Sequence, residues 1–184
     1  MKFKNLFFLF FSIATLIGCK DGTTKNTEAA TPAEVEAVSA NSFKVTVNLV
    51  TKKNDSFCLL YTEDGSLNFN DKAVWKEVKG GESEQTVEFV LPGEAFPTQL
   101  RLDLGINADQ EDVVIKSIKL SYGKNVRELK GVEMGIFFRA DASKCTFDPV
   151  TGIVKALENN GKKQNGSLYP NEAVLAVELP KLAK

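Results

Sequence analysis

The stretch LRLDLGINADQEDVVIKSIKLSY, at residues 100–122, contains two apolar alternations separated by a polar loop. In residues 100–104 every second residue is leucine, and Arg101 and Asp103 lie between the leucines. This period of two is typical of a β-strand with one buried face. Residues 113–122 alternate in the same way, and the intervening loop is rich in turn-forming Gly, Asn and Asp. The stretch therefore predicts two antiparallel strands and their connecting loop.

The second alternation changes phase within the strand. Val113 and Ile115 share one face, but the next apolar residue is Ile118, three positions after Ile115. A strand that keeps one apolar face through such a shift needs an extra residue. We therefore expect a β-bulge or a change of sheet near residues 116–117.

Similar alternations recur along the rest of the chain. They predict strands at residues 42–51, 57–61, 74–78, 84–91, 132–138, 144–147, 153–157 and 174–179. Turn signals separate these segments, and no long helical pattern interrupts them. The sequence thus predicts an all-β, jelly-roll-like antiparallel sandwich over residues 42–184. Residues 123–184 are expected to complete this sandwich or to form a small added sheet.

The first 19 residues form a targeting segment. Two lysines precede the apolar run LFFLFFSIATLI at residues 6–17, which is shorter than the ~20 residues of a membrane-spanning helix. The run ends in Leu16-Ile17-Gly18-Cys19, which resembles the bacterial lipobox. The resemblance implies a signal peptide at residues 1–18, lipidation of Cys19 and a location at the outer membrane. An ordinary signal peptide with a chance cysteine is the alternative.

Residues 19–41 differ sharply in composition from residues 42–184. They are rich in Thr, Ala and Glu and contain no aromatic residue, which predicts a flexible tether. Lys20 and Asp21 faintly resemble the charged sorting signals of surface-exposed Bacteroidetes lipoproteins. They leave the periplasmic and surface faces of the membrane both open.

The absence of histidine excludes several kinds of chemistry. Without it the chain can form neither a Ser-His-Asp triad nor a His-ligated zinc or iron site. Carboxylate-based glycan processing survives, but the 24 acidic residues single out no pair. The net charge of −1 indicates neither nucleic acid nor an anionic lipid surface as a partner. We therefore expect a protein that is not an enzyme.

Cys58 and Cys145 both lie in predicted strands. In an oxidising compartment they could form a disulfide that closes a long loop. Alternatively, each is a separate buried thiol. The sequence does not decide between these two arrangements.

The aromatic residues supply the candidate binding site. Sugars stack their C–H faces on aromatic rings, and the candidates are Trp75, Tyr61 and Tyr122, with Tyr169 also considered. Trp75 has the opposite parity to Val74 and Val78, so it can face outward, although a lone tryptophan is more often a core residue. Phe43, Phe89 and Phe138 have core parity. No cofactor or metal is expected, except that Asn68, Asn70 and Asp71, or Asn107, Asp109 and Asp112, could hold a structural Ca²⁺.

A looser resemblance covers residues 42–122. The runs SFKVTVNL, EQTVEFVLPGEAFPTQLRLDLG and VVIKSIKL look like jelly-roll accessory domains of Bacteroidetes envelope proteins, which are similar to carbohydrate-binding modules and galactose-binding-like domains. The resemblance implies a lipid-anchored, non-catalytic protein that recognises glycan or polysaccharide. The alternative is an accessory subunit of an outer-membrane protein complex, with a protein as its partner.

Overall fold

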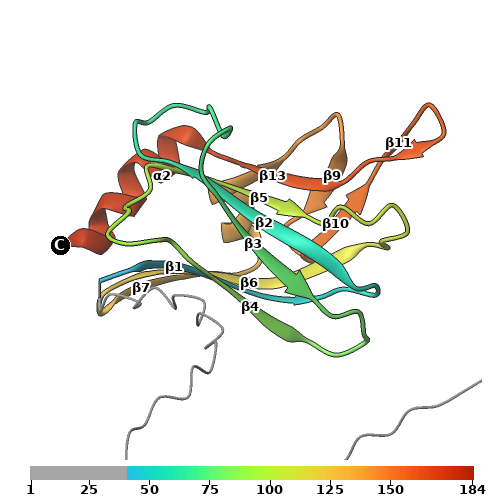
Figure 1. Ribbon diagram of the computed structural model, residues 1–184, viewed down its shortest axis with the longest axis horizontal. Coiled ribbons are helices and arrows are strands. Elements are labelled where there is room, and N and C mark those ends of the chain that lie inside the picture. Colours follow the sequence, from blue (N-terminus) through green and yellow to red (C-terminus); the bar gives the residue numbers. More distant parts are fainter. Residues whose placement is uncertain (1–40) are drawn as a thin grey trace, which may run out of the picture. The chain divides into compact units, whose positions relative to one another are not determined.

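Two antiparallel β-sheets lie face to face, with the apolar core between them (Figure 1). This computed structural model describes residues 41–184, which fall within the compact unit Glu36–Lys184. The first sheet contains β1 (Phe43–Val50), β4 (Gln85–Val90), β6 (Val113–Tyr122), β7 (Asn125–Leu129), β9 (Cys145–Asp148) and β10 (Ile153–Ala156). The second contains β2 (Asp55–Thr62), β3 (Ala73–Val78), β5 (Gln99–Leu104), β8 (Phe138–Ala140) and β13 (Gly166–Pro170). The prediction of an antiparallel β-sandwich is confirmed.

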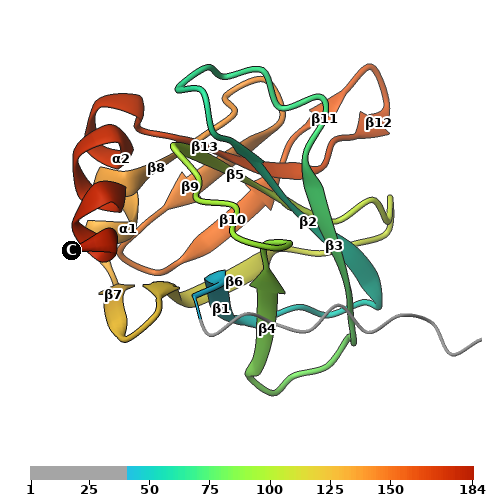
Figure 2. The same cartoon turned by 60° about the vertical axis from the view of Figure 1, so that its left-hand side comes forward.

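The remaining elements lie at the ends of the sandwich. β11 (Glu158–Asn159) and β12 (Lys162–Lys163) form a small hairpin that projects away from the sheets, as Figures 1 and 2 both show. α1 (Val132–Phe137), α2 (Glu172–Glu178) and the 3₁₀-helix η1 (Leu179–Ala183) gather at the end where the chain terminates (Figure 2). The signal peptide, Cys19 and nearly all of the predicted tether lie outside the described residues. Within the described part of the chain, no helix combines the length and apolar character that a membrane crossing requires.

The pairing of the first six strands is nested. β1 pairs with β6 in the first sheet, while β2 pairs with β5 in the second. The chain therefore folds back on itself as a double layer, which is the principle of a jelly roll. The inward residues of β1 show the alternation most clearly: Phe43, Val45, Val47 and Leu49 are all buried. Phe89 and Phe138 are also buried, as their parity predicts.

The expected bulge is present in β6. Asn48 of β1 lies opposite Ser117, but the next residue, Leu49, lies opposite Ile115. Lys116 is therefore the extra residue, and it restores an inward orientation for the apolar residues on both sides. The two strands of the stretch 100–122 are not paired with each other, because β5 belongs to the second sheet and β6 to the first. Their loop crosses between the sheets.

Asp55 holds this crossing loop in place. Its carboxylate is buried and accepts hydrogen bonds from the backbone N–H groups of Ile106 (2.8 Å) and Asn107 (3.1 Å). The side-chain amide of Gln110 donates to the other carboxylate oxygen (2.9 Å). A buried carboxylate with several donors is well satisfied. The loop is thus fixed to β2 rather than left free.

Two predicted strands are helices instead. Residues 132–138 form α1 followed by β8, and residues 174–179 lie in α2 and the start of η1. In α1 the buried residues are Met134 and Phe137, three apart, while Ile136 is exposed. In the C-terminal segment Leu175 and Leu179 are buried, four apart. The spacing of four satisfies a helical period as well as an alternation, whereas the spacing of three fits a helix and not a strand. Each helix packs its apolar side across the end of the sandwich.

Residues 123–184 both complete the sandwich and add to it. β7, β9 and β10 extend the first sheet, and β8 and β13 extend the second. β9 and β10 form the predicted hairpin, with Ala156 opposite Cys145. Only the β11–β12 hairpin forms a separate sheet among the described residues.

We predict that Gly152→Ala destabilises the protein far more than Gly161→Ala. Both glycines have positive φ, +77° and +70°, so alanine costs each about 1–3 kcal/mol of backbone strain. A Cβ at Gly152 would also lie 1.9 Å from the carbonyl oxygen of Ile115, whereas a Cβ at Gly161 meets nothing within 4 Å. Urea unfolding of the two variants measures the difference. Equal losses of unfolding free energy would contradict the close packing of β10 on β6.

Candidate functional site

Two adjacent rows of outward side chains run across the strands of the second sheet, and the outward pair Ser56–Glu77 lies beside them. We call this surface the outer face. One row contains Trp75, Cys58, Asp103 and Ser167, and the other contains Ala73, Leu60, Arg101, Tyr169 and Arg139. The rows follow from strand register, because paired residues on neighbouring strands point to the same side. The outer face thus brings aromatic and charged residues together from five strands.

Trp75 marks one end of the outer face. Its side chain lies on β3, the edge strand of the second sheet, and the residue is 55% exposed. The sequence leaves Trp75 open between the core and an outward position, with the core favoured for a lone tryptophan, and the structure places it on the surface. The outer side of the first sheet differs in character, since Thr86, Asn48 and Ser117 there form a ladder of short polar side chains.

A fixed ion pair occupies the centre of the outer face. Arg101 binds Asp103 in a bidentate manner, with Nε–Oδ1 and Nη2–Oδ2 distances of 2.8 Å each. Ser167 Oγ donates to Asp103 Oδ1 (2.6 Å), and Arg101 Nε also lies 3.2 Å from Ser167 Oγ. Both charged side chains remain partly exposed. This network holds the two polar groups in one orientation before any ligand arrives.

The opposite end of the outer face is a cluster of aromatic rings and guanidinium groups. Tyr169 lies between two arginines: Cζ of Arg101 is 4.6 Å and Cζ of Arg139 is 5.6 Å from the centroid of its ring. β13 separates the strands that carry these arginines, so they approach Tyr169 from opposite sides. Phe69, from the loop between β2 and β3, meets the same ring edge-on at 6.0 Å. Tyr169 is therefore occupied by protein contacts, and Trp75 is the exposed ring of the two rows.

Cys58 lies between Trp75 and Asp103 in the same row, below the level of their side chains. It is 1% exposed, and burial raises the pKa of its thiol to about 11, with a further increase from the negative charge of Asp103 and an opposing effect of Arg101. Burial also raises the pKa of the Cys145 thiol. Cys145 Sγ donates to the backbone carbonyl of Ser167 and accepts from its N–H, at 3.3 Å in each case. Both side chains are protonated at neutral pH and are poor nucleophiles.

The structure does not contain the disulfide considered from the sequence. Cys58 and Cys145 are both free and buried. Cys58 lies on β2 of the second sheet, whereas Cys145 lies on β9 of the first sheet and bonds the backbone of Ser167 on β13. β13 is two strand spacings from β2, which is about 10 Å. Their separation therefore exceeds the ~7 Å between Cα atoms that a disulfide can bridge. The alternative of two separate thiols describes these residues.

Tyr61 and Tyr122 do not join Trp75. Tyr61 is 5% exposed and belongs to the core between the sheets. Tyr122, on the first sheet, is partly buried and packs against Phe43 and Phe96, with ring centroids 6.5 and 5.0 Å away. Neither ring lies on the outer face. Of the three proposed ligand-binding aromatics, Trp75 alone is exposed on a sheet surface.

The three asparagines among the proposed calcium ligands make local hydrogen bonds. Asn107 Oδ1 accepts the backbone N–H of Asp109 (2.9 Å), and Asn70 donates to the side chain of Asn68. Among residues 41–184, no group of three or more Asp, Glu or Cys side chains is arranged to hold a metal ion. Local hydrogen bonds of this kind are typical of asparagine in turns.

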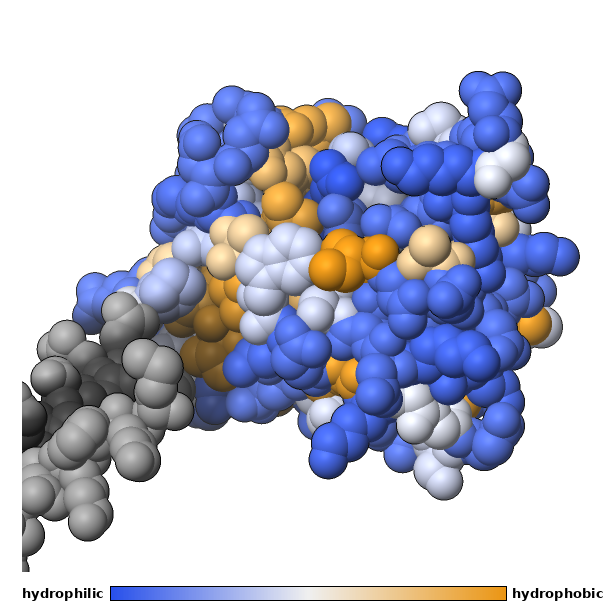
Figure 3. Space-filling model, turned by 45° about the vertical axis from the view of Figure 1, so that its right-hand side comes forward, coloured by the Kyte–Doolittle hydropathy of each residue, from blue (hydrophilic) through white to orange (hydrophobic). Residues whose placement is uncertain are grey.

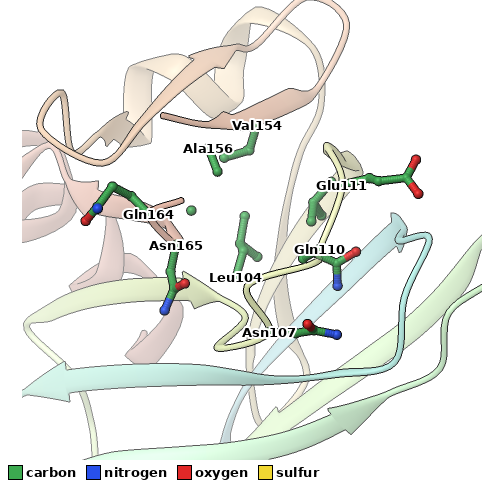
Figure 4. Close-up of a pocket in the computed structure, with 10 residues that line it drawn as sticks. Leu104, Asn107, Gln110, Glu111, Val154, Ala156, Gln164 and Asn165 are labelled. Carbon is green, nitrogen blue, oxygen red and sulfur yellow. The ribbon is translucent and has the colours of Figure 1, made fainter. Parts of the chain in front are cut away.

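The recess between the crossing loop and the β12–β13 segment is too small for a ligand. Leu104, Val154 and Ala156 line it together with Gln164 and Asn165, as Figure 4 shows. Its volume is about 10 Å³, which is room for about one water molecule. A wider depression of about 280 Å³ lies beside the loop between β2 and β3, where Lys72 is paired with Glu63. Neither hollow combines an exposed aromatic ring with unpaired polar groups.

On the face shown in Figure 3, hydrophobic groups adjoin one another in the upper and left part, and the right part is mostly hydrophilic. Elsewhere, Val132 and Ile136 of α1 are exposed, as is Val150 in the β9–β10 turn. α1 packs against this turn, since a Cβ on Gly135 would lie 2.8 Å from Cγ of Pro149. We call Val132, Ile136 and Val150 the α1 patch.

No family model matches the chain, and no curated protein or solved structure is similar enough to match it. What the outer face can bind must therefore be inferred from the side chains that it carries. They offer one exposed aromatic ring, one fixed ion pair and a guanidinium group stacked on Tyr169.

We predict that Cys58 and Cys145 resist alkylation in the folded protein and react completely once it is unfolded without reductant. Burial and the raised pKa of each thiol suppress the reactive thiolate in the native state. Iodoacetamide labelling followed by peptide mass mapping checks both positions. A pair that stays unlabelled in denaturant until reductant is added would reveal a disulfide and contradict the structure.

Proposed function

We propose that this protein is a lipid-anchored component of the bacterial cell envelope that binds glycan on its outer face without catalysing a reaction. One observation carries the proposal: the exposed ring of Trp75 shares a row with Asp103, whose carboxylate is fixed by Arg101. An apolar ring beside oriented polar groups suits a sugar, which presents C–H faces as well as hydroxyls.

The geometry divides binding between two kinds of contact. A sugar ring that stacks on the indole of Trp75 gains apolar contact and specific geometry. Asp103 lies two strands away in the same row, about 10 Å along the sheet. Hydroxyl groups on the next part of the glycan can then donate to Asp103 and accept from Arg101. Because the ion pair is already ordered, little conformational entropy is lost on binding.

The same arrangement favours binding over catalysis. Asp103 is the single carboxylate in the two rows, and Arg101 and Ser167 already donate to it. Glycoside hydrolysis by the usual mechanism needs two carboxyl groups that flank the scissile bond. The two rows offer one, which is neutralised by its ion pair, and the carboxylate of Glu77 beside them is bonded to Ser56 on the edge strand β3.

The anchoring part of the proposal rests on the lipobox-like sequence at Cys19. We expect Cys19→Ser to move the protein from the membrane fraction to the soluble fraction of the producing cells, because the thioether-linked lipid can no longer form. Ultracentrifugation and intact mass measurement check this. Lipidation at Cys19 would be overturned if the variant stayed in the membrane fraction and its mass differed from that of the wild type by the Cys-to-Ser substitution alone.

We expect Trp75→Ala to reduce glycan affinity at least about 5-fold, since stacking contacts of this kind contribute more than about 1 kcal/mol. Titration of the full chain in detergent with a panel of soluble glycans, followed by calorimetry, measures the affinity. Ile106→Ala is the matched control, because it removes another exposed apolar side chain outside the outer face. Equal affinity of wild type and Trp75→Ala would remove the outer face as the site.

A protein partner is the second candidate, and the α1 patch favours it. Val132, Ile136 and Val150 are each more than half exposed and lie on adjoining elements. Exposed apolar groups at one place on a surface are typical of contacts with another protein. In that case the protein is an accessory subunit of an envelope complex. Loss of complex formation in Ile136→Asp, with glycan binding absent in wild type, would favour it.

A further inference from the structure

Arg139 differs from the other two arginines of the chain. Arg101 is paired with Asp103 and Arg127 with Glu133, but within residues 41–184 no carboxylate lies at salt-bridge distance from Arg139. Its guanidinium group stacks over Tyr169, and the residue is exposed on β8, at the edge of the second sheet. The outer face therefore ends in a positioned cation without a counter-charge.

Neighbouring acidic residues are engaged elsewhere. Asp141 accepts hydrogen bonds from the hydroxyl and backbone N–H of Ser143 and lies 3.9 Å from Lys144. Glu77 lies two residues from Trp75 on the same face of β3 and accepts from Ser56 (2.6 Å), at the end of the outer face opposite Arg139. Within the two rows, two guanidinium groups against one carboxylate leave a net positive charge toward the end that carries Arg139. The whole chain has a net charge of −1, so this excess is local.

The distance between Arg139 and Trp75 sets the size of the ligand. β8 and β3 are the two edges of the five-stranded sheet, and four strand spacings correspond to roughly 19 Å. A single sugar cannot reach both residues, whereas an oligosaccharide of several rings laid across the strands can. It would pass over Leu60 and the Arg101–Asp103 pair on the way.

We propose that the glycan is acidic, and that a carboxylate or sulfate group on it binds Arg139 while a neighbouring part of the chain stacks on Trp75. This inference rests on the proposed function and adds the ligand class. Arg139 suits the role because its planar guanidinium group can bind an anionic group in a bidentate manner. Arg101 is less suited, since Asp103 already occupies its fork. Stacking on Tyr169 limits the conformations that Arg139 must lose on binding.

The test compares sugars that differ only in charge. Oligogalacturonates and their methyl esters form one pair, and a sulfated glycosaminoglycan and its desulfated form make a second. The full chain in detergent is titrated with each sugar and binding is measured by calorimetry and by the fluorescence of the single tryptophan. We expect at least one acidic form to bind on the order of 10-fold more tightly than its neutral partner, with an advantage that falls as salt rises.

Three variants assign that preference to Arg139. Arg139→Gln should abolish the advantage of the acidic form and leave the affinity for the neutral form within about 2-fold of wild type. Arg139→Lys should retain part of the advantage, because it keeps the charge and loses the planar fork. Arg127→Gln is the control, since it removes an arginine of the first sheet that is already paired with Glu133.

The outcomes separate the two proposals. Equal binding of acidic and neutral forms, lost in both cases with Trp75→Ala, overturns the acidic ligand and leaves glycan binding intact. An acidic preference that survives in Arg139→Gln overturns the role of Arg139. If the wild-type protein binds neither member of either pair and no other glycan of the panel, the proposed function is overturned. The proposal of an acidic ligand then fails with it.

Discussion

The fold depends on the single extra residue, Lys116, in β6. Side chains alternate with a period of two, so without the extra residue one half of β6 would turn its apolar side chains outward. The bulge lets Ile115 and Ile118 both face the core. Directly beside it, the N–H of Ile115 donates to the carbonyl of Gly152 (2.8 Å), which joins β10 to the sheet. The β9–β10 hairpin is thereby joined to the first sheet beside the bulge.

This attachment extends to the outer face. The β9–β10 hairpin carries Cys145, whose thiol exchanges hydrogen bonds with the backbone of Ser167 on β13. β13 in turn places Tyr169 between Arg101 and Arg139. A buried thiol therefore links the two sheets at the point where the charged part of the outer face is built. Cys145 contributes hydrogen bonds and packing at this position, and neither contribution requires a disulfide.

The sequence predicts the parts of the structure that depend on local alternation. The main strands and the bulge follow from the parity of residues within one segment, and the same parity permits the outward orientation of Trp75 without deciding it. The helices α1 and α2 do not, because their apolar spacings also fit a strand and only packing at the end of the sandwich distinguishes the two. The cluster around Tyr169 could not be predicted from the sequence either. Arg139 follows α1 in a strand of three residues, and its position depends on pairing with β13, about 30 residues later.

The central claim is that glycan lies across the outer face of the second sheet. Chemical-shift mapping of ¹⁵N-labelled protein during a glycan titration tests it most directly, because it locates the ligand without a prior choice of mutations. We expect saturable shifts of the Trp75 indole N–H and of the backbone at Leu60, Arg101, Tyr169 and Arg139, with the first sheet unaffected. Shifts confined to the α1 patch, or to the polar ladder around Asn48, would contradict the claim.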